Sequence, residues 1–258
     1  MKTIISKFLP AVAVAAIPLG LLAGSASAAT IYSDNFPGLS TSPLNGTTPA
    51  TDTPNVNWAA DSQWKANGSI SLSSGSYADA YLTLTPASGQ IYTLSADINA
   101  IANASGYTNS WIGFGFLSTG IANPTPFYAN AAPFILDYVP NSGTEISTWA
   151  GPGLSIPGNA YNYANSGTQD MQMVLNTGGA KWTVQFYDGG SPLGSQYSYT
   201  TNPSIVALGF GTSNASGQVS YFSLTDVAVP EPATLGLVAV GGLGLLLIGR
   251  KHAARWSV

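Results

Sequence analysis

Two carboxylates in the middle of the chain are the candidates for a catalytic acid–base pair. Asp137 and Glu145 are eight positions apart, with the turn-forming sequence of residues 140–143 between them. A retaining glycosidase needs two carboxyl groups about 5 to 5.5 Å apart. The same spacing is typical of a hairpin that carries two solvated acids, which is the interpretation we favour because Glu145 is the only glutamate between residues 29 and 229.

The composition excludes histidine-based and cysteine-based catalytic sites from the body of the protein. The single histidine, His252, lies in the basic tail of the chain, and there is no cysteine. A Ser-His-Asp triad or a histidine metal site therefore cannot be built in the body of the protein, and neither disulfides nor thiols hold or operate it. We expect no catalytic residue and no cofactor, so the protein is predicted not to be an enzyme.

Aromatic residues offer a different kind of site, because a ring exposed in a loop can stack on a sugar. Trp149 and the tyrosines of the stretch "YNYANSG", Tyr161 and Tyr163, are the candidate ligand-binding residues. Trp111 and Trp182 occupy alternating stretches that resemble strands, so we predict that both are structural.

A calcium ion is a weaker alternative. Asp34 lies in the first predicted strand and Asp226 in the last, so their carboxylates would meet if the two ends of the domain pair. No EF-hand spacing is present, and two acids supply few of the oxygen ligands that calcium takes. Ordinary surface carboxylates are the favoured interpretation, and no metal site is predicted.

The first 28 residues have the pattern of a secretory signal peptide. Lys2 and Lys7 form a basic start, an apolar run follows, and Ala26 and Ala28 flank Ser27 in a small-residue cleavage site. We expect passage through the secretion translocon and cleavage after Ala28, which makes the rest of the chain an exported protein.

The last thirty residues contain a second apolar segment. Residues 233–249 carry no charge, and Arg250, Lys251 and Arg255 follow them. A helix of this length reaches roughly 25 Å, the short limit for crossing a bilayer. We predict a transmembrane helix over 233–249 whose basic end stays on the cytoplasmic side of the inner membrane. A buried C-terminal helix is the alternative, but the segment is apolar on all sides.

Immediately before that segment stands the triplet Pro230-Glu231-Pro232, which the two prolines keep extended. The order of this triplet, a short apolar helix and a basic end resembles the PEP-CTERM sorting signal of Gram-negative bacteria over residues 229–258. The resemblance implies recognition by exosortase, a membrane-embedded protease, in bacteria that build exopolysaccharide or biofilm matrix. It implies nothing about catalysis in the domain that the signal carries.

Residues 29–228 are predicted to form one all-β ectodomain. In the stretch 91–99, Tyr92, Leu94, Ala96 and Ile98 share one face while polar residues share the other. Further strands are predicted at 31–36, 78–85, 111–117, 133–139, 170–176, 182–187, 205–211 and 219–227. No amphipathic helix of about ten or more residues appears there. Short strands separated by Gly, Asn, Ser and Pro clusters indicate an antiparallel two-sheet sandwich.

The order of several stretches in this domain resembles the concanavalin-like or laminin-G-like jelly roll. These are "YSDNF", "SADIN", "WIGFGFL", "KWTVQFYDGG" and "VSYFSLTDVAV". Members of that fold often bind carbohydrate and some hydrolyse it, so the fold alone does not decide the function.

Charge excludes one class of partner. Between residues 29 and 229 the chain has two basic and ten acidic residues, a net charge of −8, which repels a phosphate backbone, so no nucleic-acid binding is expected. We predict an exported cell-surface or extracellular-matrix protein, sorted by exosortase, with a non-catalytic structural or adhesive role associated with exopolysaccharide. A lectin-like carbohydrate-binding module is the first alternative, and a glycoside hydrolase is the second.

Overall fold

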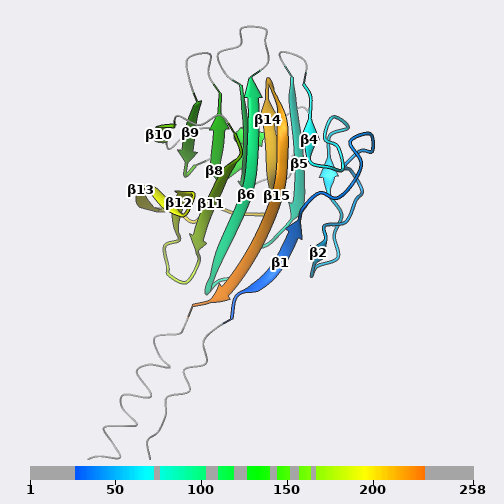
Figure 1. Cartoon of the computed structure of the whole chain (residues 1–258). Coiled ribbons are helices and arrows are strands. Elements are labelled where there is room, and N and C mark those ends of the chain that lie inside the picture. Colours follow the sequence, from blue (N-terminus) through cyan, green and yellow to red (C-terminus); the bar gives the residue numbers. More distant parts are fainter. Residues whose placement is uncertain are drawn as a thin grey trace, which may run out of the picture.

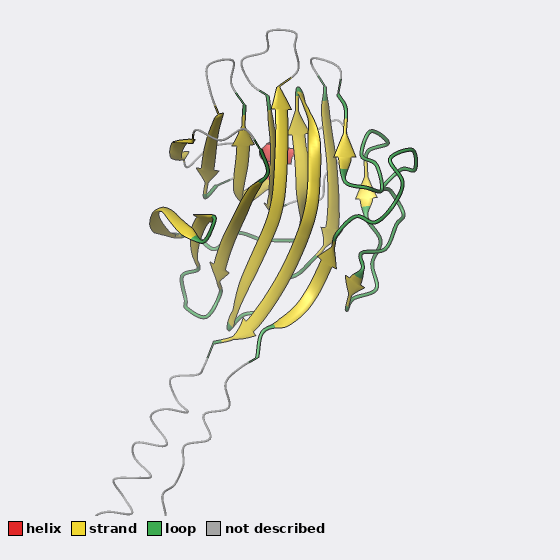
Figure 2. Ribbon diagram, in the orientation of Figure 1, coloured by secondary structure: helices red, strands yellow, loops and turns green. Residues whose placement is uncertain are grey.

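The computed structural model describes residues 27–72, 76–102, 110–118, 127–139, 144–151, 157–163 and 167–229. These residues form β-strands joined by turns, and α1 is the single short helix among them (Figure 2). The elements are β1 (Ala29–Asp34), β2 (Thr51–Asp52), β3 (Ala59–Ala60), β4 (Ser69–Ile70), β5 (Tyr77–Thr83), β6 (Gln90–Ala102), β7 (Trp111–Leu117), α1 (Phe127–Asn130), β8 (Ala131–Tyr138), β9 (Thr144–Trp149), β10 (Pro157–Tyr163), β11 (Gln169–Asn176), β12 (Thr183–Asp188), β13 (Ser191–Ser198), β14 (Ala207–Ser213) and β15 (Ala215–Ala228).

The strands are divided between two antiparallel sheets that pack face to face (Figure 1). The eight-stranded sheet has the order β13-β12-β11-β6-β15-β1-β2, with β4 also paired to β15. The seven-stranded sheet has the order β10-β9-β8-β7-β14-β5-β3. The predicted all-β sandwich of two antiparallel sheets is therefore confirmed.

Alternation of apolar residues located the core strands to within a few positions. The stretch predicted at 111–117 is β7, that at 78–85 is β5, and that at 205–211 is β14, shifted by two residues. Strands β9, β10 and β13 were not predicted, because the first is rich in Thr and Ser and the other two in Gly, Asn, Pro and Ser. Strands β10 and β13 are sheet edges, where one side needs no partner strand and polar sequence is tolerated.

Aromatic side chains fill the space between the sheets. Phe210 of β14 and Phe222 of β15 come from opposite sheets, and their ring centroids are 5.4 Å apart. The ring of Trp58 lies 5.0 Å from Phe210 and 5.4 Å from Phe222. Its Nε1 donates to Oδ2 of Asp34 at 2.9 Å, which satisfies the one polar atom of the indole inside the core. Burial raises the pKa of Asp34 above its usual value.

The two ends of the described chain meet at one pole of the sandwich, which we call the terminal pole (Figure 1). Strands β1 and β15 pair antiparallel, with Ala29 opposite Asp226. The backbone N–H of Val229, just after β15, donates to the carbonyl of Gly89 at 2.8 Å. Val229 also packs over Gly178, where an added Cβ would lie 2.7 Å from a Val229 methyl. The chain therefore stays tied to the sandwich up to the residue before Pro230.

The central aromatic contact gives a stability prediction. Replacing Phe210, which is fully buried among Trp58, Trp64 and Phe222, by Ala should lower the free energy of unfolding by about 3–5 kcal/mol. Leu39→Ala is the matched control, because Leu39 is 68% exposed and should change stability by under about 0.5 kcal/mol. Urea unfolding measures both, and equal losses would contradict the assigned core.

Candidate functional site on the outer face of the seven-stranded sheet

The outer face of the seven-stranded sheet, the side turned away from the other sheet, carries most of the residues suited to binding. Strand β5 shows how the sequence divides its two faces: Ala78, Ala80 and Leu82 enter the core between the sheets. The alternate residues, including Tyr77 and Asp79, belong to the outer face. The same alternation places Glu145 and Trp149 of β9 on that face, because Ile146 between them is in the core.

Glycines in neighbouring strands let other chain segments lie close on this face. Gly211 of β14 is opposite Asp79 on one side and Gly113 of β7 on the other. A Cβ at Gly211 would lie 2.4 Å from Cβ of Phe127 and 2.5 Å from Oδ1 of Asp79, so only glycine leaves room for helix α1 to cover the sheet here. Phe127 is consequently fully buried in a second apolar cluster, separate from the core between the sheets.

Aromatic rings border this covered region on two sides. On one side Tyr128 of α1 lies between Tyr77 and Trp111, with ring centroids 6.3 and 6.0 Å away. Tyr77 is 42% exposed, and its side chain is hydrogen-bonded to that of Tyr128. On the other side Trp149 stacks on Phe134 at 5.2 Å with an interplanar angle of 12°. The half-buried rings at these two borders present both apolar surface and polar groups to solvent.

Asp79 is a buried acid beside the first aromatic border. Its side chain is 6% exposed, and its Oδ1 has no hydrogen-bond partner among the described residues. Burial, and secondarily the charge of Asp61, raises the pKa of Asp79 to about 8, although the N–H of Phe127 donates to the carboxyl and opposes the rise. Oδ2 of Asp61 accepts from the backbone N–H of Asp79 at 2.8 Å. At neutral pH Asp79 is therefore mostly protonated and able to donate a hydrogen bond.

The structure separates the two carboxylates that could have formed a hydrolytic pair. Strands β8 and β9 do form a hairpin, but Asp137 is opposite Ile146, whereas Glu145 is opposite Tyr138. Asp137 therefore belongs to the core face and Glu145 to the outer face. The expectation that both acids are solvated was wrong for Asp137, which is 1% exposed and accepts from the backbone N–H of Ala100 at 3.0 Å. Oε1 of Glu145 accepts from Ser147 Oγ at 2.6 Å.

The three predicted ligand-binding aromatics lie on strands, not in loops. Trp149 ends β9, and Tyr161 and Tyr163 are in β10. Tyr161 is opposite Ile146, three positions from Trp149, so the strand positions of Tyr161 and Trp149 belong to opposite faces of the sheet. Only Trp149 is placed with the outer-face residues. Trp111 is buried at 6% exposure and Trp182 packs against the core, as the alternation predicted.

The two candidate calcium ligands are not brought together. Strands β1 and β15 do pair, but Asp34 is opposite Phe222 and Asp226 is opposite Ala29. Phe222 and Asp226 are four positions apart on β15, so Asp34 and Asp226 are separated by about 13 Å along the strand direction. Within the described residues no group of three or more His, Cys, Asp or Glu side chains is placed to hold a metal ion.

Most residues of the predicted signals lie outside the described part of the chain. These are Ala26, Pro230, Glu231, Pro232, segment 233–249, Arg250, Lys251 and Arg255. Ala28 is described and exposed, directly before β1. In the portion of the chain that is described, no helix has the length and apolarity to cross a membrane.

Comparison with protein-family models decides what the C-terminal sequence is. Residues 228–251 match the model described as the PEP-CTERM protein-sorting motif. The chain carries a PEP-CTERM sorting motif. The match begins at the last residue of β15 and includes Pro230-Glu231-Pro232 as well as Arg250 and Lys251. The PEP-CTERM segment therefore starts where the described sandwich ends, at the terminal pole. A search of curated proteins finds none that matches the chain.

Solved structures similar to the sandwich are lectin-like jelly rolls. A mutant of the Emp46p carbohydrate recognition domain has a TM-score of 0.50 and 11% identity, covering 72% of this chain and 97% of its own. Peanut lectin has a TM-score of 0.48 and 10% identity, covering 80% and 100%. An endo-1,3-beta-glucanase from Streptomyces sioyaensis has 0.47 and 13%, covering 78% and 97%. At these identities the likeness shows the fold alone, a concanavalin-like jelly roll joined to a PEP-CTERM motif.

Tyr77, Asp79 and Tyr128, at the first aromatic border, were not among the site residues predicted from the sequence. Tyr77 and Asp79 alternate with Ala78 and Ala80 in "YADAYLT", so their place on the face opposite the core could have been predicted once β5 was recognised. The approach of Asp61 to Asp79 and the cover provided by α1 depend on tertiary contacts, and no sequence pattern indicates them.

The raised pKa of Asp79 predicts a pH-dependent stability. Between pH 4 and pH 8 the folded protein holds a proton on Asp79 that the unfolded chain releases, so stability should fall as pH rises through this range. The slope is at most about 1.4 kcal/mol per pH unit. Asp79→Asn should flatten this dependence, measured by urea unfolding at pH 5 and pH 8. Asp61→Asn removes only the neighbouring charge and should give an intermediate slope. An unchanged slope in Asp79→Asn would contradict the assignment.

Proposed function

We propose that this protein is exported, handled by exosortase at its PEP-CTERM motif, and displayed at the cell surface or in the extracellular matrix. The proposed role of its β-sandwich is structural or adhesive, in association with exopolysaccharide. The matched sorting motif carries this proposal, because it is the most specific functional signal in the chain. The secretion translocon and, transiently, the inner membrane are the other partners that the proposed route requires.

The geometry of the terminal pole supports the proposed route. Ala28, the expected last residue of the signal peptide, directly precedes β1, and the PEP-CTERM match begins at the end of β15. The pairing of β1 with β15 puts both junctions side by side. Cleavage at the two junctions would remove both end segments without breaking a strand. The folded domain would therefore be released complete.

A carbohydrate-binding role for the sandwich is the second candidate, and the outer face favours it. The exposed ring of Tyr77 and the half-buried ring of Tyr128 lie next to one another beside Asp79, and Trp149 lies across the covered region. Aromatic faces combined with a few polar groups are typical of sites that hold sugars. Binding a matrix polysaccharide through these residues would give the adhesive role a physical basis.

The proposed role is non-catalytic. Asp137 and Glu145 belong to opposite faces of the seven-stranded sheet, so they cannot flank one glycosidic bond. Among the other acids, Asp61 approaches Asp79, and its Oδ2 accepts from the backbone N–H of Asp79; Asp97 and Asp170 are opposite each other on β6 and β11 of the other sheet. Asp79 itself is buried against Phe127 and Gly211.

The sorting role is tested by replacing Pro230, Glu231 and Pro232 with alanine in the producing organism. Without the rigid triplet, exosortase should no longer process the chain, so the full-length precursor should accumulate in the membrane and surface protein should be lost. Immunoblots of membrane and surface fractions measure this. Pro192→Ala, at an exposed proline of edge strand β13, is the control and should be processed normally. Normal processing of the triple variant would refute the sorting role.

The adhesive role is tested by binding to the exopolysaccharide of the producing organism. Tyr77→Ala should weaken binding about tenfold through lost ring contact. Tyr221→Ala is the matched control, because Tyr221 is similarly exposed at 37% but lies on β15 of the other sheet. Co-sedimentation measures both, and equal affinities would exclude the outer face as the site. No reducing sugar should be released, and release that Glu145→Gln abolishes would contradict the non-catalytic role.

A further inference from the structure

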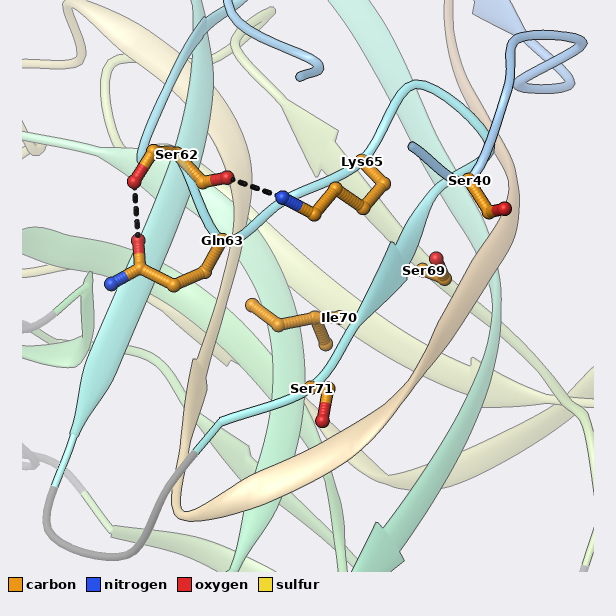
Figure 3. A pocket seen from close by; sticks show the side chains of 7 residues that line it. All are labelled: Ser40, Ser62, Gln63, Lys65, Ser69, Ile70 and Ser71. Atoms are coloured by element: carbon orange, nitrogen blue, oxygen red, sulfur yellow. Dashed lines mark hydrogen bonds between the residues drawn. The ribbon is translucent and has the colours of Figure 1, made fainter. Parts of the chain in front are cut away.

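A polar pocket of about 530 Å³ lies beside β4, at the edge of the eight-stranded sheet. Its lining side chains come from the loop after β1, from the loop before β4, from β4 itself and from the residue after it (Figure 3). They are Ser40, Ser62, Gln63, Lys65, Ser69, Ile70 and Ser71. A pocket of this volume is in the range that holds small ligands. None of these seven residues is aromatic, which distinguishes the pocket from the outer face of the other sheet.

The lining offers hydroxyl groups, one amide and one ammonium. Lys65 Nζ donates to the carbonyl of Ser62 at 2.9 Å, which uses one of its three protons. Oγ of Ser62 lies 3.5 Å from Oε1 of Gln63, so the Gln63 amide group keeps its donors for a ligand. Ile70, which is 4% exposed, contributes an apolar contact below these groups. Hydroxyls around an apolar floor suit a sugar, which has both C–H and O–H surface.

Charge narrows the ligand class. Lys65 is one of only two basic residues between positions 29 and 229, in a stretch with a net charge of −8, yet none of the seven lining residues is acidic. An ammonium at such a place attracts a carboxylate and forms a stronger hydrogen bond with it than with a neutral acceptor. A neutral sugar would offer no anionic partner to the Lys65 ammonium.

The pocket is held in shape by backbone contacts. The N–H of Lys65 donates to the carbonyl of Ser69 at 3.0 Å, and the N–H of Gly68 donates to the carbonyl of Lys65 at 2.8 Å. Lys65 also bridges to Pro43, and its neighbour Trp64 is fully buried. A site already ordered before binding loses little conformational entropy on taking a ligand.

From these contacts we propose that the pocket beside β4 binds a carboxylate-bearing sugar unit, with Lys65 holding the carboxylate and the serine hydroxyls and Gln63 holding the sugar hydroxyls. This goes beyond the proposed function, because it is a second binding site, in the other sheet from the aromatic rows, with a defined ligand chemistry.

To test this, sodium glucuronate, glucose and sodium acetate are titrated separately into the full chain in detergent micelles. Isothermal titration calorimetry measures the affinity for each. Glucuronate should bind, with glucose and acetate each about tenfold weaker, and added salt should weaken glucuronate binding. Lys65→Gln should lose about tenfold in glucuronate affinity, and Lys65→Arg should retain most of it. Lys181→Gln is the control. It removes the other lysine between residues 29 and 229, at an exposed position outside the pocket, and should bind like the wild type.

Two outcomes overturn the proposal: glucose or acetate binding as tightly as glucuronate, or Lys65→Gln binding like the wild type. Absence of glucuronate binding overturns it as well. Ser71→Leu, at an exposed lining residue, should block the pocket without touching the core and gives a second variant. Because Tyr77→Ala tests the outer face independently, failure of the pocket leaves the proposed function intact.

Discussion

Strand β15 is the element on which the rest of the molecule depends. Its fourteen residues pair with β6 along most of their length, and with β1 and β4 on the other edge. Its Phe222 contacts Phe210 and Trp58 in the core between the sheets. This last strand before the PEP-CTERM motif therefore joins β6 to β1 and β4 within the eight-stranded sheet and completes the core.

This placement links folding to sorting. Because β15 is central in its sheet, the motif leaves the domain from a strand that cannot be pulled away without opening the core. The hydrogen bond from Val229 to Gly89 keeps the chain attached up to the residue before the Pro-Glu-Pro triplet. A protease that acts on the motif would thus meet a finished domain, with the N-terminal junction next to the C-terminal one.

The sequence predicted the parts of the structure that depend on local pattern. The recurring apolar residues of β7 and β14 identified strands that are buried along their whole length, and the Pro-Glu-Pro triplet before an apolar segment identified the sorting motif. Burial of Asp137 was not predictable, because its partner, the backbone of Ala100, is far away in sequence. The faces occupied by Trp149 and Tyr161 depend on the register of β9 with β10, which was not predicted as a strand. The meeting of Asp61 with Asp79 is likewise a tertiary event.

Release of the domain by processing at the PEP-CTERM motif is tested by the intact mass of the protein recovered from the cell surface or matrix. We expect a chain that begins at Ala29 and ends before the apolar segment 233–249, with the sandwich complete through β15. A surface protein with the mass of residues 29–258 would rule out this processing, because the PEP-CTERM motif would then have served only as an anchor.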